Sequence, residues 1–145
     1  MKRNLLQQAA VLKAVDGAVL AGSTAKVGEV LDFAGYRSAI LCVNYAATTS
    51  DPSVANVTLT MVEGDTSSPA TAVTFNVTPT VINALTAGVL EMHIDLTPFK
   101  RYGKFTLTPA YTGGTSPNIY AGATITLGDK NIDPTPSAVT IYKKA

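Results

Sequence analysis

Apolar and polar residues alternate one by one along several separate stretches of this chain. In one of them, threonines separate Val57, Leu59 and Met61. The same period of two recurs in residues 72–78, 89–96, 104–111 and 120–127. Successive side chains of a β-strand point to opposite faces of the sheet. The pattern therefore predicts antiparallel strands with one face in a core and the other in solvent.

Weaker strand signals lie at residues 26–33 and 138–142. A more continuously apolar run, residues 35–45, is typical of a central strand that is covered on both faces. Gly, Pro, Asp and Asn gather between the strands, at residues 48–53, 63–70, 111–118 and 128–137. Short strands separated by turns, without a helical period, predict an all-β fold. We expect an antiparallel β-sandwich or jelly roll with extended N- and C-terminal segments.

The chain divides by pattern into three segments. Residues 1–25 fit either a helical stripe or two short strands around an Asp-Gly turn, and we predict an N-terminal arm or edge hairpin there. Residues 26–128 hold the sandwich, and residues 129–145 form a C-terminal strap or strand. We expect both terminal segments to contact other subunits, so that their removal would leave the isolated sandwich folded.

The charge balance restricts the partners. The chain has 145 residues, of which 14% are charged, and its eleven Lys and Arg against ten Asp and Glu give a net charge of +1. A strongly basic field is absent, so we expect no nucleic-acid partner. Polar residues interrupt every apolar stretch, including the N-terminal one, so we expect neither a signal peptide nor a membrane partner. A weakly charged exterior suits a subunit that packs against neighbours.

Catalytic and metal-binding signals are weak. Glu91, His93 and Asp95 project from one face of a predicted strand, where they could hold a divalent metal or exchange a proton. The same three residues are equally the polar half of an alternating strand, and we favour that interpretation. The single cysteine, Cys42, has no disulfide partner within the chain and reads as a small buried hydrophobe. We expect no enzymatic activity and no cofactor.

Cations gather in residues 95–109, between two predicted strands. A cluster of this kind beside an aromatic residue is typical of a phosphate-binding surface. Its small size and the nearby acidic residues instead favour a contact with an acidic patch on another subunit. We predict that the Tyr102 ring is packed and that the Arg101 guanidinium ties a loop or an acidic neighbour. The candidate interaction residues are Lys100, Arg101, Tyr102, Lys104, Asp129 and Lys130.

The order of short motifs over residues 29–134 resembles the decoration or cement proteins of tailed-bacteriophage capsids. The first motif is an Asp-x-x-Gly-Tyr-x-Ser-Ala stretch, and it is followed by an Arg-Tyr strand and by a Gly-to-Pro exit after an Ala-rich strand. In this chain they correspond to Asp32, Gly35, Tyr36, Ser38 and Ala39, then to Arg101 and Tyr102, and last to residues 128–134.

The resemblance implies a jelly-roll protein that forms homodimers or homotrimers on the outside of an icosahedral head. There it would cross-link neighbouring major capsid proteins, after synthesis in the cytoplasm of the bacterial host. The alternative that the residues leave open is a receptor- or carbohydrate-binding β-sandwich, such as a fibre or adhesion module.

Overall fold

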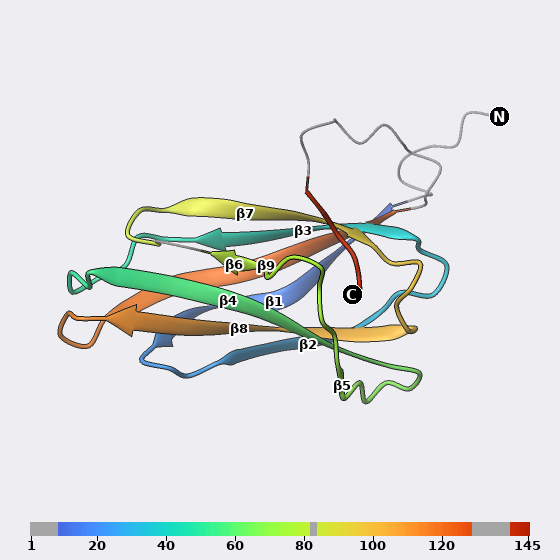
Figure 1. Ribbon diagram of the computed structural model, residues 1–145, viewed down its shortest axis with the longest axis horizontal. Coiled ribbons are helices and arrows are strands. Elements are labelled where there is room, and N and C mark those ends of the chain that lie inside the picture. Colours follow the sequence, from blue (N-terminus) through green and yellow to red (C-terminus); the bar gives the residue numbers. More distant parts are fainter. Residues whose placement is uncertain (1–8, 82–83, 129–139) are drawn as a thin grey trace.

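Two β-sheets packed face to face form the protein (Figure 1). The computed structural model describes residues 9–81, 84–128 and 140–145. One sheet, sheet A, has the strand order β1 (Ala9–Ala21), β9 (Asn118–Gly128), β3 (Ser38–Tyr45), β7 (Gly88–Asp95) and β10 (Ile141–Tyr142). The other, sheet B, has the order β2 (Lys26–Asp32), β8 (Tyr102–Thr112), β4 (Val54–Gly64) and β5 (Thr71–Ala72), and β6 (Thr80–Val81) also pairs with β4.

Consecutive long strands alternate between the two sheets. The chain passes from β1 in sheet A to β2 in sheet B, then to β3 in sheet A and β4 in sheet B, and later from β7 to β8 to β9 in the same way. All of these pairings are antiparallel, and β1 and β9 are neighbours although they lie at opposite ends of the chain. This is the connectivity of a jelly roll, as the sequence predicts. No helix among the described residues is long and apolar enough to span a membrane.

The core forms where the sequence alternates. Inward-facing residues of β4, β7, β8 and β9 meet between the sheets, and removing their apolar surface from water stabilises the fold by about 25 cal/mol per Å². The predicted inward residues that are buried are Val57, Leu59, Met61, Phe75, Met92, Ile94, Leu96, Phe105, Leu107, Ala121, Ala123, Ile125 and Leu127. For β4, β7, β8 and β9, the period of two therefore predicts both the strand and its buried face.

The N-terminal prediction is wrong for the residues that the structure describes. Residues 9–21 form one edge strand, β1, that pairs with β9 over its whole length. Its register shifts between Lys13 and Ala18, and this irregularity lies where we expected an Asp-Gly turn between two strands. Three residues of β1, Ala14, Val15 and Leu20, belong to the core. The sandwich therefore begins before residue 26, and residues 1–8 lie outside the described residues.

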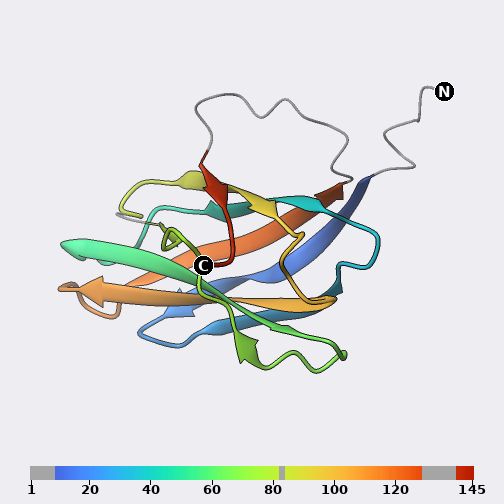
Figure 2. The same ribbon diagram turned by 45° about the vertical axis from the view of Figure 1, so that its right-hand side comes forward.

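At the C-terminus we expected a strap or a strand, and residues 141–142 form a strand, β10. β10 pairs in parallel with β7, and Tyr142 belongs to the core. Figure 2 shows this last segment crossing from β7 toward the stretch that follows β5. It is part of the sandwich and not a strap outside it, whereas residues 129–139 lie outside the described residues.

Two further strand predictions need correction. Residues 72–78 alternate, yet only Thr71–Ala72 form a strand there, and Phe75 makes an isolated bridge to Lys144. The start of this stretch pairs with β4, and residues 74–76 pair with the C-terminal segment, so no single ladder extends along it. Residues 38–45 do form the central strand β3, but its outer face is open to solvent, with Ile40 37% exposed.

Candidate interaction surfaces

Within the predicted basic cluster, Arg101 is paired with an acid. Its Nε atom donates to Asp32 Oδ1 at 3.1 Å and its Nη2 atom donates to Asp32 Oδ2 at 2.8 Å. The Phe33 backbone N–H donates to the Arg101 carbonyl at 2.7 Å, so side chain and backbone both join the start of β8 to the end of β2. The guanidinium and the Ala34 N–H hold the pKa of Asp32 below its usual value. The predicted acidic neighbour of Arg101 thus lies within the same chain.

Tyr102 and Lys104 lie on the outer face of sheet B, where each is half-buried. The Arg101 guanidinium lies 4.9 Å from the centre of the Tyr102 ring, a cation–π contact. The ring lies outside the core, because Gly103 occupies the inward position. A side chain at Gly103 would meet Phe33 at 2.4 Å and Met61 at 2.6 Å, so the core is already full there.

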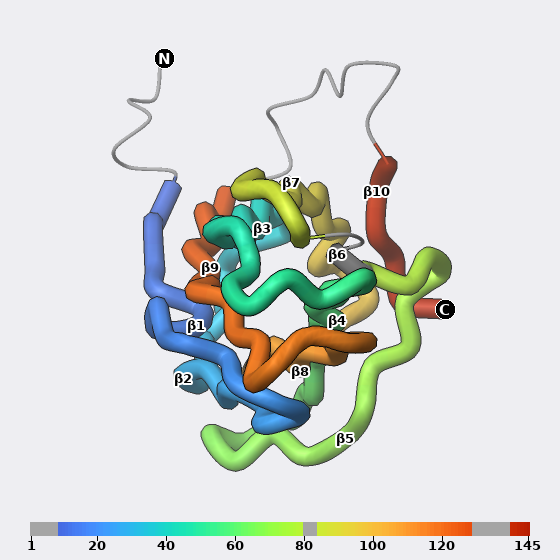
Figure 3. The backbone as a smooth tube through the Cα atoms, turned by 90° about the vertical axis from the view of Figure 1, so that its left-hand side faces the viewer, coloured from blue at the N-terminus to red at the C-terminus, as the bar shows by residue number. Residues whose placement is uncertain are grey.

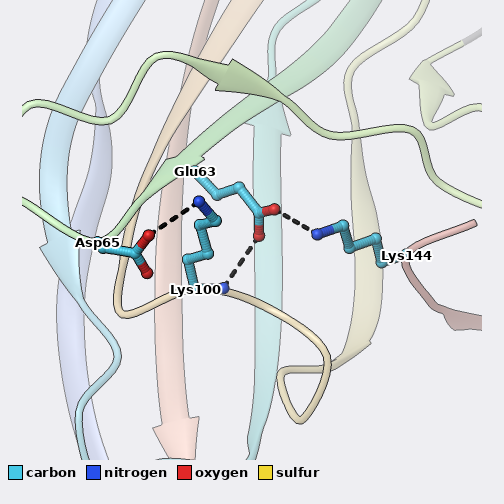
Figure 4. Close-up of polar contacts among 4 residues, drawn as sticks. All are labelled: Glu63, Asp65, Lys100 and Lys144. Carbon is cyan, nitrogen blue, oxygen red and sulfur yellow. Dashed lines mark hydrogen bonds and ion pairs between the residues drawn. The ribbon is translucent and has the colours of Figure 1, made fainter.

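Lys100 belongs to a second polar cluster, around a fully buried carboxylate (Figure 4). Its ammonium contacts Asp65 at 2.9 Å, which raises the pKa of Lys100. Its backbone N–H donates to Glu63 Oε2 at 3.0 Å, and the other oxygen of Glu63 accepts from the Lys144 ammonium. Glu63 is therefore held by two segments that lie far apart in the sequence. The phosphate-binding interpretation loses two of its cations, because Lys100 and Arg101 are both paired with acids.

The sequence analysis missed Glu63 and Lys144. Glu63 could have been found, because it occupies the inward phase of β4 after Val57, Leu59 and Met61, where an apolar residue is expected. Nothing near Lys144 in the sequence marks it as the partner. The remaining candidates, Asp129 and Lys130, lie outside the described residues.

The Glu-x-His-x-Asp stretch lies on the outer face of β7, as predicted. His93 Nε2 contacts Glu91 Oε1, and across the sheet Cys42 of β3 faces Glu91. No group of three or more potential metal ligands exists among the residues that the structure describes. Cys42 is half-buried on this outer face and not in the core as predicted, and partial burial raises the pKa of its thiol.

Several exposed apolar residues lie on the outer face of sheet A. Strand register places Val11, Thr126, Ile40, His93 and Ile141 in one row across all five strands. Val89 continues the face on β7, and Val19 and Tyr120 are neighbours on β1 and β9. Six of its residues are exposed large hydrophobics, with exposed fractions of 36 to 71%: Val11, Val19, Ile40, Val89, Tyr120 and Ile141.

An open groove of about 640 Å³ crosses the same face. Its lining includes Lys13, Asn44, Val89, Tyr120 and Thr124. Part of its wall is glycine: a side chain at Gly17 would come within 2.4 Å of the Tyr120 hydroxyl, and one at Gly122 within 2.8 Å of the Gly17 Cα. The glycines therefore let the Tyr120 side chain lie close against β1. The groove combines apolar and aromatic surface with a few polar groups at its margin.

No protein-family model matches the chain, and no curated protein sequence is similar to it. Solved structures do share its fold. The VP2 subviral particle of infectious bursal disease virus aligns with a TM-score of 0.56 and 11% identity over 84% of this chain and 32% of that chain. The PBSX exported protein XepA aligns with a TM-score of 0.51 and 17% identity over 97% of this chain and 43% of that chain.

These similarities establish the fold of the chain. The T13 viral particle of infectious bursal disease virus aligns in the same way, with a TM-score of 0.54 and 11% identity, over 84% of this chain and 31% of that chain. The chain thus spans less than half the length of each of these three chains. These proteins share the β-sandwich with this chain, but a shared fold does not show which molecules the chain contacts.

Proposed function

We propose that this protein is a virion structural protein that decorates and cements the outside of an icosahedral phage capsid by cross-linking major capsid proteins. The observation that carries the proposal is the outer face of sheet A, with its exposed valines, Ile40, Tyr120 and Ile141. The jelly roll shared with a viral particle supports it. The partners are the major capsid protein and further copies of the chain, as a homodimer or homotrimer, at the virion exterior.

The physical basis is apolar surface that folding leaves in water. Contiguous apolar patches on a soluble protein mark interaction sites. Covering such a patch is worth about 25 cal/mol per Å², and a symmetric shell repeats the contact at every equivalent position. Charged side chains, among them Lys13 and Glu91, also lie on this face, so a neighbouring protein would cover the apolar residues around them. A modest contact per copy therefore suffices to hold a whole shell.

The proposal is tested by placing a charge on this face. We expect Val89→Asp to reduce binding to heads of the encoding phage at least tenfold in a co-sedimentation assay, because a carboxylate would have to lose its water at the interface. Val54→Asp is the matched control: Val54 is also an exposed valine, at 40%, but lies on β4 in sheet B. Both variants should keep the wild-type melting temperature. Wild-type protein that fails to bind heads, or equal binding by both variants, would contradict the proposal.

The groove on the same face favours a second candidate, a carbohydrate-binding module. Tyr120 is 55% exposed and supplies an aromatic surface beside Asn44 and Thr124, whose polar groups could bond sugar hydroxyls. This candidate expects glycan binding that Tyr120→Ala abolishes. If the capsid proposal is correct, neither the wild type nor Tyr120→Ala gives a signal on a glycan array.

A further inference from the structure

The C-terminal segment Thr140–Ala145 is held as a bound peptide would be. On one side β10 pairs in parallel with β7, with Ile141 opposite His93 and Tyr142 opposite Ile94. On the other side the segment runs antiparallel to residues 74–76. A parallel neighbour cannot be reached through a tight hairpin, so the segment enters this position at the end of a longer connection.

Asn76 binds the backbone of the segment at three points. Its N–H donates to the Lys143 carbonyl at 2.9 Å, its Oδ1 accepts from the Lys143 N–H at 2.8 Å, and its Nδ2 donates to the Ile141 carbonyl at 3.4 Å. The Ala145 N–H donates to the Thr74 carbonyl at 2.7 Å. These bonds recognise an extended backbone and do not depend on its side chains.

Alternate side chains supply the selectivity. Tyr142 is buried, and its ring packs edge-on against Phe75 at 6.2 Å, with Phe99 behind Phe75 at 6.0 Å. Lys144 places its ammonium on buried Glu63 (Figure 4). Strand addition at a sheet edge works in this way, with main-chain bonds for affinity and pockets for every second side chain. The site therefore selects a strand with an aromatic residue two positions before a lysine.

None of these contacts involves the connection between Gly128 and Thr140. This connection has eleven residues, 129–139. A connection of this length can span up to about 40 Å when extended. The same contacts are therefore available to the segment of a neighbouring copy, and local concentration decides which copy supplies it.

We propose that Glu63, Phe75, Asn76 and Phe99 form a strand-binding site that takes the segment Thr140–Ala145 of a neighbouring copy when copies are crowded together. The inference rests on the proposed function in one respect, because a capsid surface supplies the crowding. After exchange, the segment of each copy would be bound by a neighbour while its chain stayed attached to its own sandwich. The decorating proteins would then be joined to one another as well as to the capsid.

Disulfide trapping in the full chain tests this proposal. Thr74 and Ala145 are exposed and lie opposite each other, so cysteines at these positions can join, in a Cys42→Ser background. After unfolding and refolding in dilute solution, we expect cross-linked monomers on a non-reducing gel. After refolding at high concentration, and on phage heads, we expect covalent dimers or larger species. Cross-linked monomers alone under every condition would overturn the proposal.

The matched control moves one cysteine away from the site. Thr60→Cys with Ala145→Cys also has two exposed thiols, but Thr60 lies on the outer face of sheet B. This pair should give no more dimer than random collision does. Equal dimer yields from both pairs would also overturn the proposal.

Complementary charge reversal gives a second readout. Glu63→Lys and Lys144→Glu each place like charges together within one copy, whereas exchange between the two variants restores both ion pairs. We expect each variant alone to melt below the wild type and a co-refolded mixture to form a mixed oligomer with a recovered melting temperature. Replacing Lys144→Glu by Lys143→Glu should prevent this recovery, because the Lys143 side chain points into solvent.

Two results together would show that the segment stays with its own copy: the mixture of charge-reversed variants melts as the two separate variants do, and the cysteine pair gives cross-linked monomers only. Binding of wild-type protein to phage heads is read separately. Heads that bind the protein without intermolecular cross-links would leave the capsid function standing and remove the exchange.

Discussion

At the scale of single residues, the buried carboxylate of Glu63 joins the C-terminal segment to the sandwich. Removing a carboxylate from water costs several kcal/mol unless a cation and further hydrogen bonds compensate. The Lys100 backbone and the Lys144 ammonium provide this compensation, one to each oxygen. The last two residues of the chain are thereby tied to the core.

Lys144→Met should consequently destabilise the fold. The change leaves the buried Glu63 carboxylate without its cation, and we expect the free energy of unfolding to fall by about 2 kcal/mol, measured by urea unfolding at pH 7. Lys143→Met is the control. Its side chain is exposed, so its stability should change by less than about 0.5 kcal/mol. Equal losses in the two variants would mean that the ion pair contributes little.

The residue scale also marks where sequence analysis succeeds and fails. We expected the Arg101 guanidinium to tie a loop or an acidic neighbour, and an acidic neighbour is what it contacts. The identity of that neighbour, Asp32, was not expected, since the two residues are 69 positions apart and meet only through the pairing of β2 with β8. The period of two that puts Phe105 and Leu107 in the core also puts Gly103 inward and Tyr102 outward, whereas the cation–π contact of Tyr102 with Arg101 does not follow from that period.

At the scale of elements, the backbones of β1 and β2 approach each other closely at one margin of the sandwich. Figure 3 shows these two strands beside each other at one side of the sandwich, with β10 on the opposite side. The register of each strand shifts there, and Lys13 of β1 contacts Glu29 of β2 at 2.8 Å. The two irregularities bring the sheets together and protect an edge that would otherwise be open to further pairing.

Gly28→Ala tests this margin. A side chain at Gly28 would stand 1.9 Å from the Ala14 carbonyl oxygen and 2.9 Å from that of Phe105, and both are backbone atoms that cannot move aside alone. We expect a loss of about 1–3 kcal/mol in the free energy of unfolding. Gly128→Ala is the control, since its new side chain would meet only Ser38 Oγ, at 3.5 Å. An unchanged stability of Gly28→Ala would show that the margin relaxes freely.

Elements with long alternation were predictable, and elements fixed by distant contacts were not. β4, β7, β8 and β9 carry the period of two and bury the residues it selects. β1 was not recognised, because its irregularity at residues 14–17 breaks that period. β10 has only two residues and depends on Asn76 and β7 for its position, so its own sequence could not place it.

At the scale of the whole molecule, the first and last described strands, β1 and β10, are built into the same core as the middle of the chain. β1 pairs with β9, the C-terminal segment pairs with β7 and with residues 74–76, and Tyr142 belongs to the core that Leu20 and Phe105 share. A division into arm, sandwich and strap would predict that the terminal segments melt first. The structure predicts one cooperative unit instead.

We therefore expect a single unfolding transition. Far-UV circular dichroism follows the strands, and tyrosine fluorescence includes Tyr111, whose hydroxyl donates to Leu20 of β1, and Tyr142 of β10. The two signals should give coincident melting curves with equal calorimetric and van't Hoff enthalpies. Refolding should take milliseconds to seconds. The pairing of β1 with β9 closes a loop of nearly the whole chain, and the entropy lost in closing it precedes the favourable contacts. Deleting residues 140–145 should lower that one transition without splitting it. A separate early transition that disappears with the deletion would instead establish the C-terminal segment as an independent strap.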